Sequence, residues 1–178
     1  MRRLWPAAVL LFGLIVSESA QACMMEAPLV PADVKFADVV VIGRITNYQI
    51  VLDQEFRRKG GYTDPELTTK PVFMSDYARF EVSVDEVLRG EAPRTLIVTW
   101  DNSTFAEPET MPPGPYLIAL RKPGSNMPPL RGPSATISAN PEPNVLTVLQ
   151  APCAPAFILP NGDKDAAAIR KILAAEKR

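Results

Sequence analysis

The sequence predicts an all-β barrel that ends in a single α-helix. The chain has 178 residues and 19 prolines. Because a proline inside a helix costs roughly 3 kcal/mol, this number of prolines excludes a mostly helical protein. Strand-like runs also follow one another with no helical pattern alternating between them, and a long helical pattern appears only near the end of the chain.

Three strands are expected in the first part of the chain. Residues 39–52 are dominated by β-branched side chains and are apolar on both faces at their start. Gly43 inside this run indicates a bulge or bend, as in strands that coil into a barrel. A second strand is expected over 77–84, where apolar and polar residues alternate before a turn at 87–90, and a third over 95–100.

Two more strands are expected over 116–120 and 145–149, each bracketed by turn residues. The connection over 53–76 is long and polar, and such connections are often functional. The segment 122–143 is interpreted as loop with at most an edge strand, because proline cannot donate a hydrogen bond to a β-ladder.

Helical structure is expected at the two ends of the mature chain. Residues 31–37 can form one or two turns with Pro31 in the favoured first position. A longer helix is predicted over 164–177, with Asp163 as its N-cap and an apolar face that includes Ile169 and Leu173.

The number and spacing of these elements suit a five-stranded barrel of the oligonucleotide/oligosaccharide-binding (OB) type, with a long first connection. An immunoglobulin-like sandwich is the alternative. That fold requires about seven strands and a cysteine pair that joins its two sheets.

Residues 1–22 have the order of a secretory signal peptide. A basic start is followed by an apolar run over 4–16 and by an Ala-Gln-Ala exit site that ends at Ala22. The run is too short for a bilayer core of about 30 Å, so a transmembrane anchor is the weaker alternative. Cleavage after Ala22 would leave a single mature domain over 23–178, in the periplasm or outside the cell. A lipoprotein modified at Cys23 is a further alternative.

The two cysteines are expected to form one disulfide, Cys23–Cys153, because export places them in an oxidising compartment. Two unpaired thiols, or a lipidated Cys23 beside a free Cys153, are the alternatives.

The composition excludes several chemistries. There is no histidine, which removes Ser-His-Asp and Cys-His catalysis and histidine-ligated zinc. Two cysteines cannot build a four-thiolate metal site, and no metal or cofactor is expected. The formal net charge of −1 argues against nucleic acid as a main partner.

The order of features resembles the netrin-like module, which includes the tissue inhibitors of metalloproteinases. The resemblance rests on Cys23 at the mature N-terminus and on a late Cys153 before a C-terminal helix. Between them it uses the motifs ADVVVIGRI (37–45), FEVSVDEVLRG (80–90) and GPYLIAL (114–120). It implies a five-stranded barrel with helices packed at its ends. It also implies that the amine and carbonyl of Cys23 could chelate a protease's zinc while Met24 enters the specificity pocket.

Two groups of charged residues are candidate sites. The basic run Arg57, Arg58 and Lys59 in the first connection could bind an anionic ligand, or it could be a solvated tip. Among the acidic residues, Asp85-Glu86 and the pair Glu107 and Glu109 are the tightest clusters, and a hydrolase would need two carboxyl groups across a cleft.

The function predicted from these observations is that of an exported, non-enzymatic interaction domain with one disulfide. Its partner would be an unidentified protein or surface ligand. The alternatives are a metalloprotease inhibitor acting through Cys23 and a carboxylate-based hydrolase.

Overall fold

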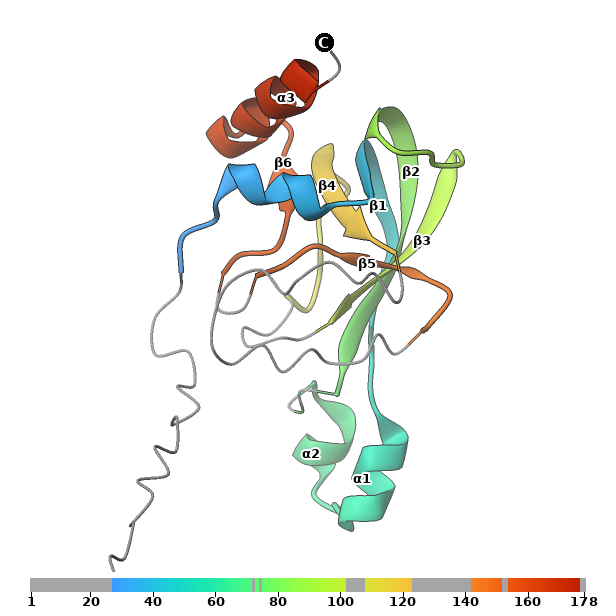
Figure 1. Cartoon of the computed structure of the whole chain (residues 1–178). Helices are drawn as coiled ribbons and strands as arrows, with labels where there is room; N and C mark the ends of the chain where they lie inside the picture. Colours follow the sequence, from blue (N-terminus) through green and yellow to red (C-terminus); the bar gives the residue numbers. More distant parts are fainter. Residues whose placement is uncertain are drawn as a thin grey trace, which may run out of the picture.

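The protein is an all-β barrel that carries a C-terminal helix, as the sequence predicts (Figure 1). The computed structural model describes residues 27–71, 73, 75–101, 108–122, 142–151 and 154–176. One sheet has the strand order β1-β2-β3-β5-β4-β6, and an additional pairing of β1 with β4 closes the first five strands into a barrel. The strands are β1 (Val39–Val51), β2 (Tyr77–Arg89), β3 (Thr95–Asp101), β4 (Tyr116–Arg121), β5 (Leu146–Val148) and β6 (Ile158–Pro160).

The pairing pattern is antiparallel everywhere except between β3 and β5, which run parallel. The short strand β6 pairs with the first half of β4, residues 116–118, and was not predicted. The strand β2 continues to Arg89, so the turn expected at 87–90 begins only at Gly90, where φ is +71°.

Gly43 marks a bend in β1, as predicted. The register between β1 and β2 shifts between Ile42 and Gly43. A Cβ atom at position 43 would lie 2.6 Å from the carbonyl oxygen of Ser83, so the two backbones approach more closely than any other residue allows.

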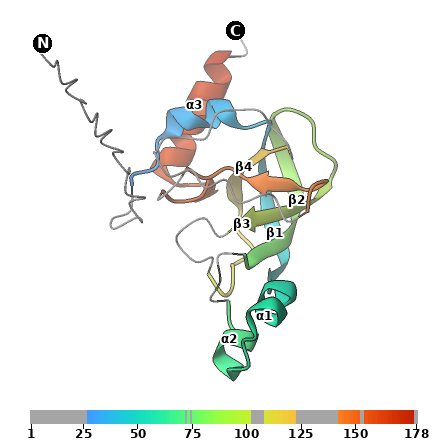
Figure 2. The same cartoon turned by 60° about the horizontal axis from the view of Figure 1, so that its bottom comes forward.

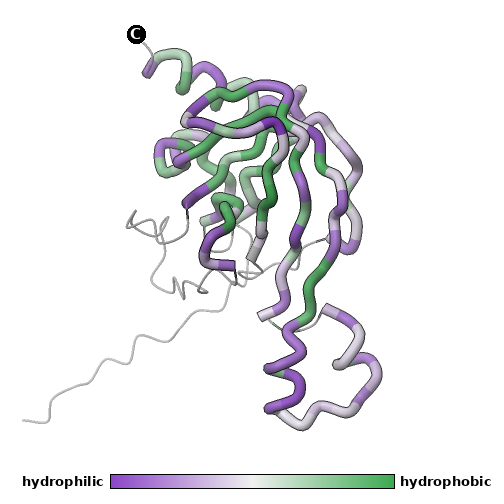
Figure 3. The backbone as a smooth tube through the Cα atoms, turned by 90° about the vertical axis from the view of Figure 1, so that its right-hand side faces the viewer, coloured by the Kyte–Doolittle hydropathy of each residue, from purple (hydrophilic) through white to green (hydrophobic). Residues whose placement is uncertain are grey.

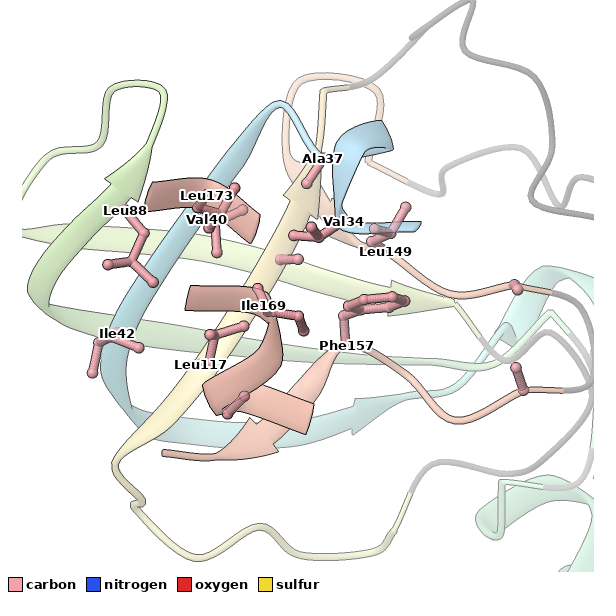
Figure 4. Packing of buried hydrophobic residues seen from close by; sticks show 14 residues of the cluster. Val34, Ala37, Val40, Ile42, Leu88, Leu117, Leu149, Phe157, Ile169 and Leu173 are labelled. Carbon is pink, nitrogen blue, oxygen red and sulfur yellow. The ribbon is translucent and has the colours of Figure 1, made fainter. Parts of the chain in front are cut away.

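Residues 39–43 of β1 and most of β4 are buried on both faces, which explains why these stretches read as continuous apolar runs. One face fills the barrel, in a cluster of Val39, Val41, Ile45, Phe80, Val82, Leu96, Val98, Tyr116, Ile118, Leu120, Val148 and Ala156. The other face contributes to a second cluster, the helix-side core (Figure 4), which comprises Val34, Ala37, Val40, Ile42, Leu88, Leu117, Ala119, Leu149, Ala151, Ala154, Phe157, Ala166, Ile169 and Leu173.

Two helical segments cover the helix-side core. The 3-10 helix η1 (Pro31–Phe36) and the helix α3 (Lys164–Glu176) confirm the predicted elements, although Lys177 lies outside the described residues. Arg89 connects both segments to the barrel, since it donates to the carbonyl oxygen of Val34 and pairs with Glu176. Within the described ranges, no helix is long and apolar enough to cross a bilayer.

The long connection between β1 and β2 is folded rather than an irregular loop. It contains the helices α1 (Gln54–Gly60) and α2 (Pro65–Thr69), and we call residues 53–76 the lobe. The lobe extends from the barrel at the end of the molecule away from α3 (Figures 1 and 2). Figure 3 shows that it is mostly hydrophilic, unlike the barrel strands.

Replacing Gly43 with alanine tests the close approach of β1 to β2. We expect Gly43→Ala to lower the free energy of unfolding by about 1–3 kcal/mol, because the new methyl group would force the two backbones apart. Gly162→Ala is the matched control, since no atom lies within 4 Å of the added Cβ there. Chemical denaturation measures both variants, and equal effects would contradict the bend.

Candidate functional site

The root of the lobe is closed by hydrogen bonds between its two ends. The backbone N–H of Asp53 donates to Oδ1 of Asp76 at 2.8 Å, although 23 residues separate them. The N–H of Phe73 donates to the other carboxylate oxygen of Asp76 at 3.1 Å. The Asp76 carboxylate therefore joins the start of the lobe to its end, next to the first residue of β2.

The interior of the lobe is an ion pair. Nη1 and Nη2 of Arg57 lie 2.5 Å and 2.8 Å from Oδ1 and Oδ2 of Asp76, a bidentate arrangement. The exposed fraction is 2% for Arg57 and 0% for Asp76. The same guanidinium also donates to the carbonyl oxygens of Asp53, Leu67 and Lys70.

These contacts keep the pair ionised. Burial opposes the charged form of Asp76, but the hydrogen bonds from Arg57, from Asp53 N–H and from Phe73 N–H outweigh it, so the pKa of Asp76 lies below its usual value. The hydrogen bond to Asp76 likewise raises the pKa of Arg57 despite desolvation. Every N–H group of the buried Arg57 guanidinium has an acceptor. Without its partner, either Arg57 or Asp76 would be a buried and uncompensated charge.

Both helices of the lobe have capped ends. Asp53 accepts a hydrogen bond from Phe56 N–H at the start of α1, and Asp64 accepts one from Glu66 N–H at the start of α2. Gly61 ends α1 in the left-handed conformation, with φ of +67°. These local signals explain how so short a segment forms two helices.

Three aromatic side chains lie in mutual contact on the lobe, and we call them the aromatic surface: Phe56, Tyr62 and Phe73. The ring centroids are 6.0 Å apart for Phe56 and Tyr62, 5.0 Å for Phe56 and Phe73, and 4.8 Å for Tyr62 and Phe73. The exposed fraction is 44% for Phe56 and 36% for Tyr62. The guanidinium of Arg57 lies 4.8 Å from the Phe73 ring centroid, which joins the aromatic surface to the ion pair.

The predicted basic run is divided by the fold. Arg57 points into the lobe, where protein acceptors use its donors, so it does not present its charge to a ligand. Arg58 and Lys59 are exposed on α1. Lys59 pairs with Glu55 at 2.6 Å, an exposed contact of the kind that contributes little.

The acidic clusters do not form a pair across a cleft in the part of the chain that the structure describes. Asp85 and Glu86 are successive residues of β2, so their side chains leave on opposite faces. Asp85 contacts Arg44, and Glu86 contacts Arg170 of α3. Glu109 is exposed, and Glu107 lies outside the described residues. Among described residues, no group of three or more acidic or cysteine side chains could hold a metal ion.

The residues around the predicted disulfide are partly described. Cys23, Met24 and Cys153 lie outside the described residues. However, Ala151 and Ala154, on either side of Cys153, are buried in the helix-side core, and Ala27, four positions after Cys23, packs against the same cluster.

The chain matches no protein-family model, no curated protein and no solved structure in comparisons with known proteins. The resemblance to the netrin-like module therefore stays a prediction.

The aromatic surface is the feature that sequence reasoning missed. Phe56, Tyr62 and Phe73 are the three aromatic residues of a connection that is mostly polar, and this contrast was the available signal. Their contact depends on the path of the chain through α1 and α2, which has no periodicity to reveal it.

Replacing Asp76 with asparagine tests the ionic interior of the lobe. Asp76→Asn leaves Arg57 buried without a counter-charge, a loss of about 3–5 kcal/mol for pairs of this kind. Among the described residues, the lobe is joined to the barrel at its root, where Asp53 bonds to Asp76. We therefore expect the backbone amides of α1 to lose protection from hydrogen exchange while the barrel amides keep theirs.

The matched control is Glu55→Gln, which removes the exposed pair with Lys59. Its expected effect is within about 0.5 kcal/mol. Unchanged protection of α1 in Asp76→Asn, or uniform loss across the barrel, would contradict a separately stabilised lobe.

Proposed function

We propose that this chain is an exported, non-enzymatic binding domain that contacts its partner through the aromatic surface of the lobe. The observation that carries the proposal is the exposure of Phe56 and Tyr62, at 44% and 36%, on a segment whose buried side chains, among the residues that the structure describes, are Arg57 and Asp76. Large aromatic rings are favoured at binding surfaces because they offer contact area at little cost in conformational entropy.

The ion pair supports this role by holding the rings in place. Arg57 contacts Asp76 and lies against Phe73, and Phe73 contacts both exposed rings. A surface that is ordered before binding loses less entropy when the complex forms. The barrel then serves as the scaffold that presents the lobe.

Binding rather than catalysis is favoured by the residue types available. The chain has no histidine. The neighbouring acids Asp85 and Glu86 each pair with an arginine on a different face of β2. Asp85 and Glu86 therefore do not form the pair of carboxyl groups across a cleft that a carboxylate-based hydrolase needs.

Export and the disulfide Cys23–Cys153 belong to the same proposal. They are supported by the signal-like segment 1–22 and by the packing of Ala27, Ala151 and Ala154 into or against one core. A disulfide there would attach the start of the mature chain to the segment before β6. The netrin-like resemblance is part of this proposal, and the closed barrel with η1 and α3 on its outer face is compatible with it.

Expression of the full chain in a secreting bacterial host tests export and the disulfide together. We expect the intact mass of the recovered protein to correspond to a chain that begins at Cys23, with Cys23 and Cys153 alkylated only after reduction. In the control Cys153→Ser, Cys23 should react without reduction. An acylated Cys23, or thiols that react freely in the unchanged protein, would overturn this part of the proposal.

Photo-crosslinking in the secreting cell tests the binding surface while the partner is still unidentified. A photoreactive residue placed at Tyr62 should give cross-linked products, because the partner would cover the aromatic surface. The control position is Lys171, which is exposed on α3 at the end of the molecule away from the lobe (Figure 1). Equal cross-linking at both positions, or none at position 62, would contradict binding through the lobe.

A further inference from the structure

The turn that joins β6 to α3 contains the dipeptide Asn161-Gly162. The N–H of Asp163 donates to the carbonyl oxygen of Pro160 at 2.8 Å, which closes a turn with Asn161 and Gly162 at its centre. Gly162 is exposed, and a Cβ atom placed there would meet no atom within 4 Å. The backbone at Gly162 is therefore sterically open on the side where other residues carry a side chain.

The N–H of Gly162 donates to no acceptor among the residues that the structure describes. Its two neighbours in the turn differ, since the N–H of Asn161 donates to the carbonyl oxygen of Pro115 at 3.0 Å and the N–H of Asp163 donates to Pro160. A backbone nitrogen that is not held by an acceptor can turn toward the side chain of the preceding residue. In this turn, that side chain is the amide of Asn161.

A guanidinium group contacts the same side-chain amide. Nη2 of Arg170 lies 2.7 Å from Oδ1 of Asn161, and Nη1 lies 3.1 Å from Oε2 of Glu86 on β2. A cationic donor at Oδ1 draws electrons away from Cγ and stabilises the negative charge that forms on Oδ1 when a nucleophile adds to that carbon. Arg170 thus makes the contact with Asn161 that an oxyanion hole makes with a reacting carbonyl group.

We propose that Asn161 is a site of spontaneous deamidation, in which the nitrogen of Gly162 is the nucleophile and Arg170 stabilises the oxyanion. The Gly162 nitrogen loses its proton to hydroxide and forms a bond to Cγ of Asn161. The C–N bond of the side-chain amide then breaks, ammonia leaves with a proton taken from water, and a cyclic succinimide remains. Water opens the ring at either carbonyl group, which gives aspartate or isoaspartate at position 161. This modification does not depend on the proposed binding role of the lobe.

The two products change the attachment of α3 in opposite ways. Aspartate places a carboxylate against Arg170, and such a charge-assisted hydrogen bond is stronger than the amide contact that it replaces. Isoaspartate adds a methylene group to the main chain two positions before Asp163, whose Oδ1 accepts from the N–H of Asp165 at 2.7 Å at the start of α3. Because Ile169 and Leu173 of α3 cover the helix-side core (Figure 4), the isoaspartate form should hold this cover less firmly.

Peptide mapping by mass spectrometry after incubation of the purified protein in neutral buffer tests the site. We expect Asn161 to be converted to both acidic products, of which the isoaspartate is labelled by an isoaspartyl methyltransferase. Asn144 is the control within the same chain. It is also exposed in a turn, but the next residue, Val145, is β-branched and its N–H donates to the carbonyl oxygen of Glu142 at 2.9 Å. No conversion of Asn161, or equal conversion of Asn144, would overturn the assignment.

Two variants test the nucleophile and the donor. Gly162→Ala adds a methyl group in open space at a residue without a positive φ, so the fold should be kept, and little product should form in the time in which half of the unchanged protein reacts. Arg170→Ala should slow the reaction about tenfold, less than the loss of an oxyanion donor costs in a closed active site. Glu86→Gln is the matched control, because it removes the charge at the other contact of Arg170 and should react at the unchanged rate.

Hydrogen exchange of the α3 amides separates an effect on the reaction from an effect on the structure. An unchanged or faster reaction in Arg170→Ala would overturn the role of Arg170, and an unchanged reaction in Gly162→Ala would overturn the succinimide route. The second result stands even where Arg170→Ala loosens α3, because Gly162→Ala keeps that arginine. The isoaspartate form, separated by ion exchange, should show faster exchange in α3 than the unmodified protein. Equal exchange would overturn the proposed effect on the attachment of α3.

Discussion

The pairing of β1 with two neighbours is the constraint on which the rest of the structure depends. Residues 39–43 of β1 pair with β4 on one side, and β1 pairs with β2 along most of its length on the other. This double pairing closes the barrel and buries both faces of residues 39–43, which requires apolar side chains at consecutive positions. Beyond Gly43, β1 no longer pairs with β4 and continues with β2 toward the lobe. Closure of the barrel and presentation of the lobe are thus consequences of one strand.

The described part of the lobe is ordered around a buried ion pair. Among its described residues, the buried side chains are Arg57 and Asp76, and the guanidinium donates to carbonyl groups from both ends of the segment. A buried ion pair contributes less to stability than a well-packed apolar core, but it demands one geometry because every donor needs its acceptor. With charge inside, the aromatic rings remain at the surface, where they can contact another molecule.

The two sides of the molecule have different roles. The outer face of β1 and β4 is covered by η1 and α3, and its apolar side chains are satisfied within the chain. The lobe lies at the end away from α3 and carries the exposed Phe56 and Tyr62. This division separates the part of the molecule that provides stability from the part proposed to bind.

The sequence by itself determined the barrel class, the approximate strands, the bend at Gly43 and the helices at both ends. These features follow from local periodicity, proline placement and capping, which act over a few residues. The lobe was decided only by tertiary structure. The basic run looked like a solvated tip or a ligand loop, because nothing local reveals that Arg57 meets a carboxylate 19 positions later. The contact of Phe56, Tyr62 and Phe73 lies beside that ion pair, because Arg57 packs against the Phe73 ring. Long-range pairing of isolated side chains leaves no periodic signal in the chain.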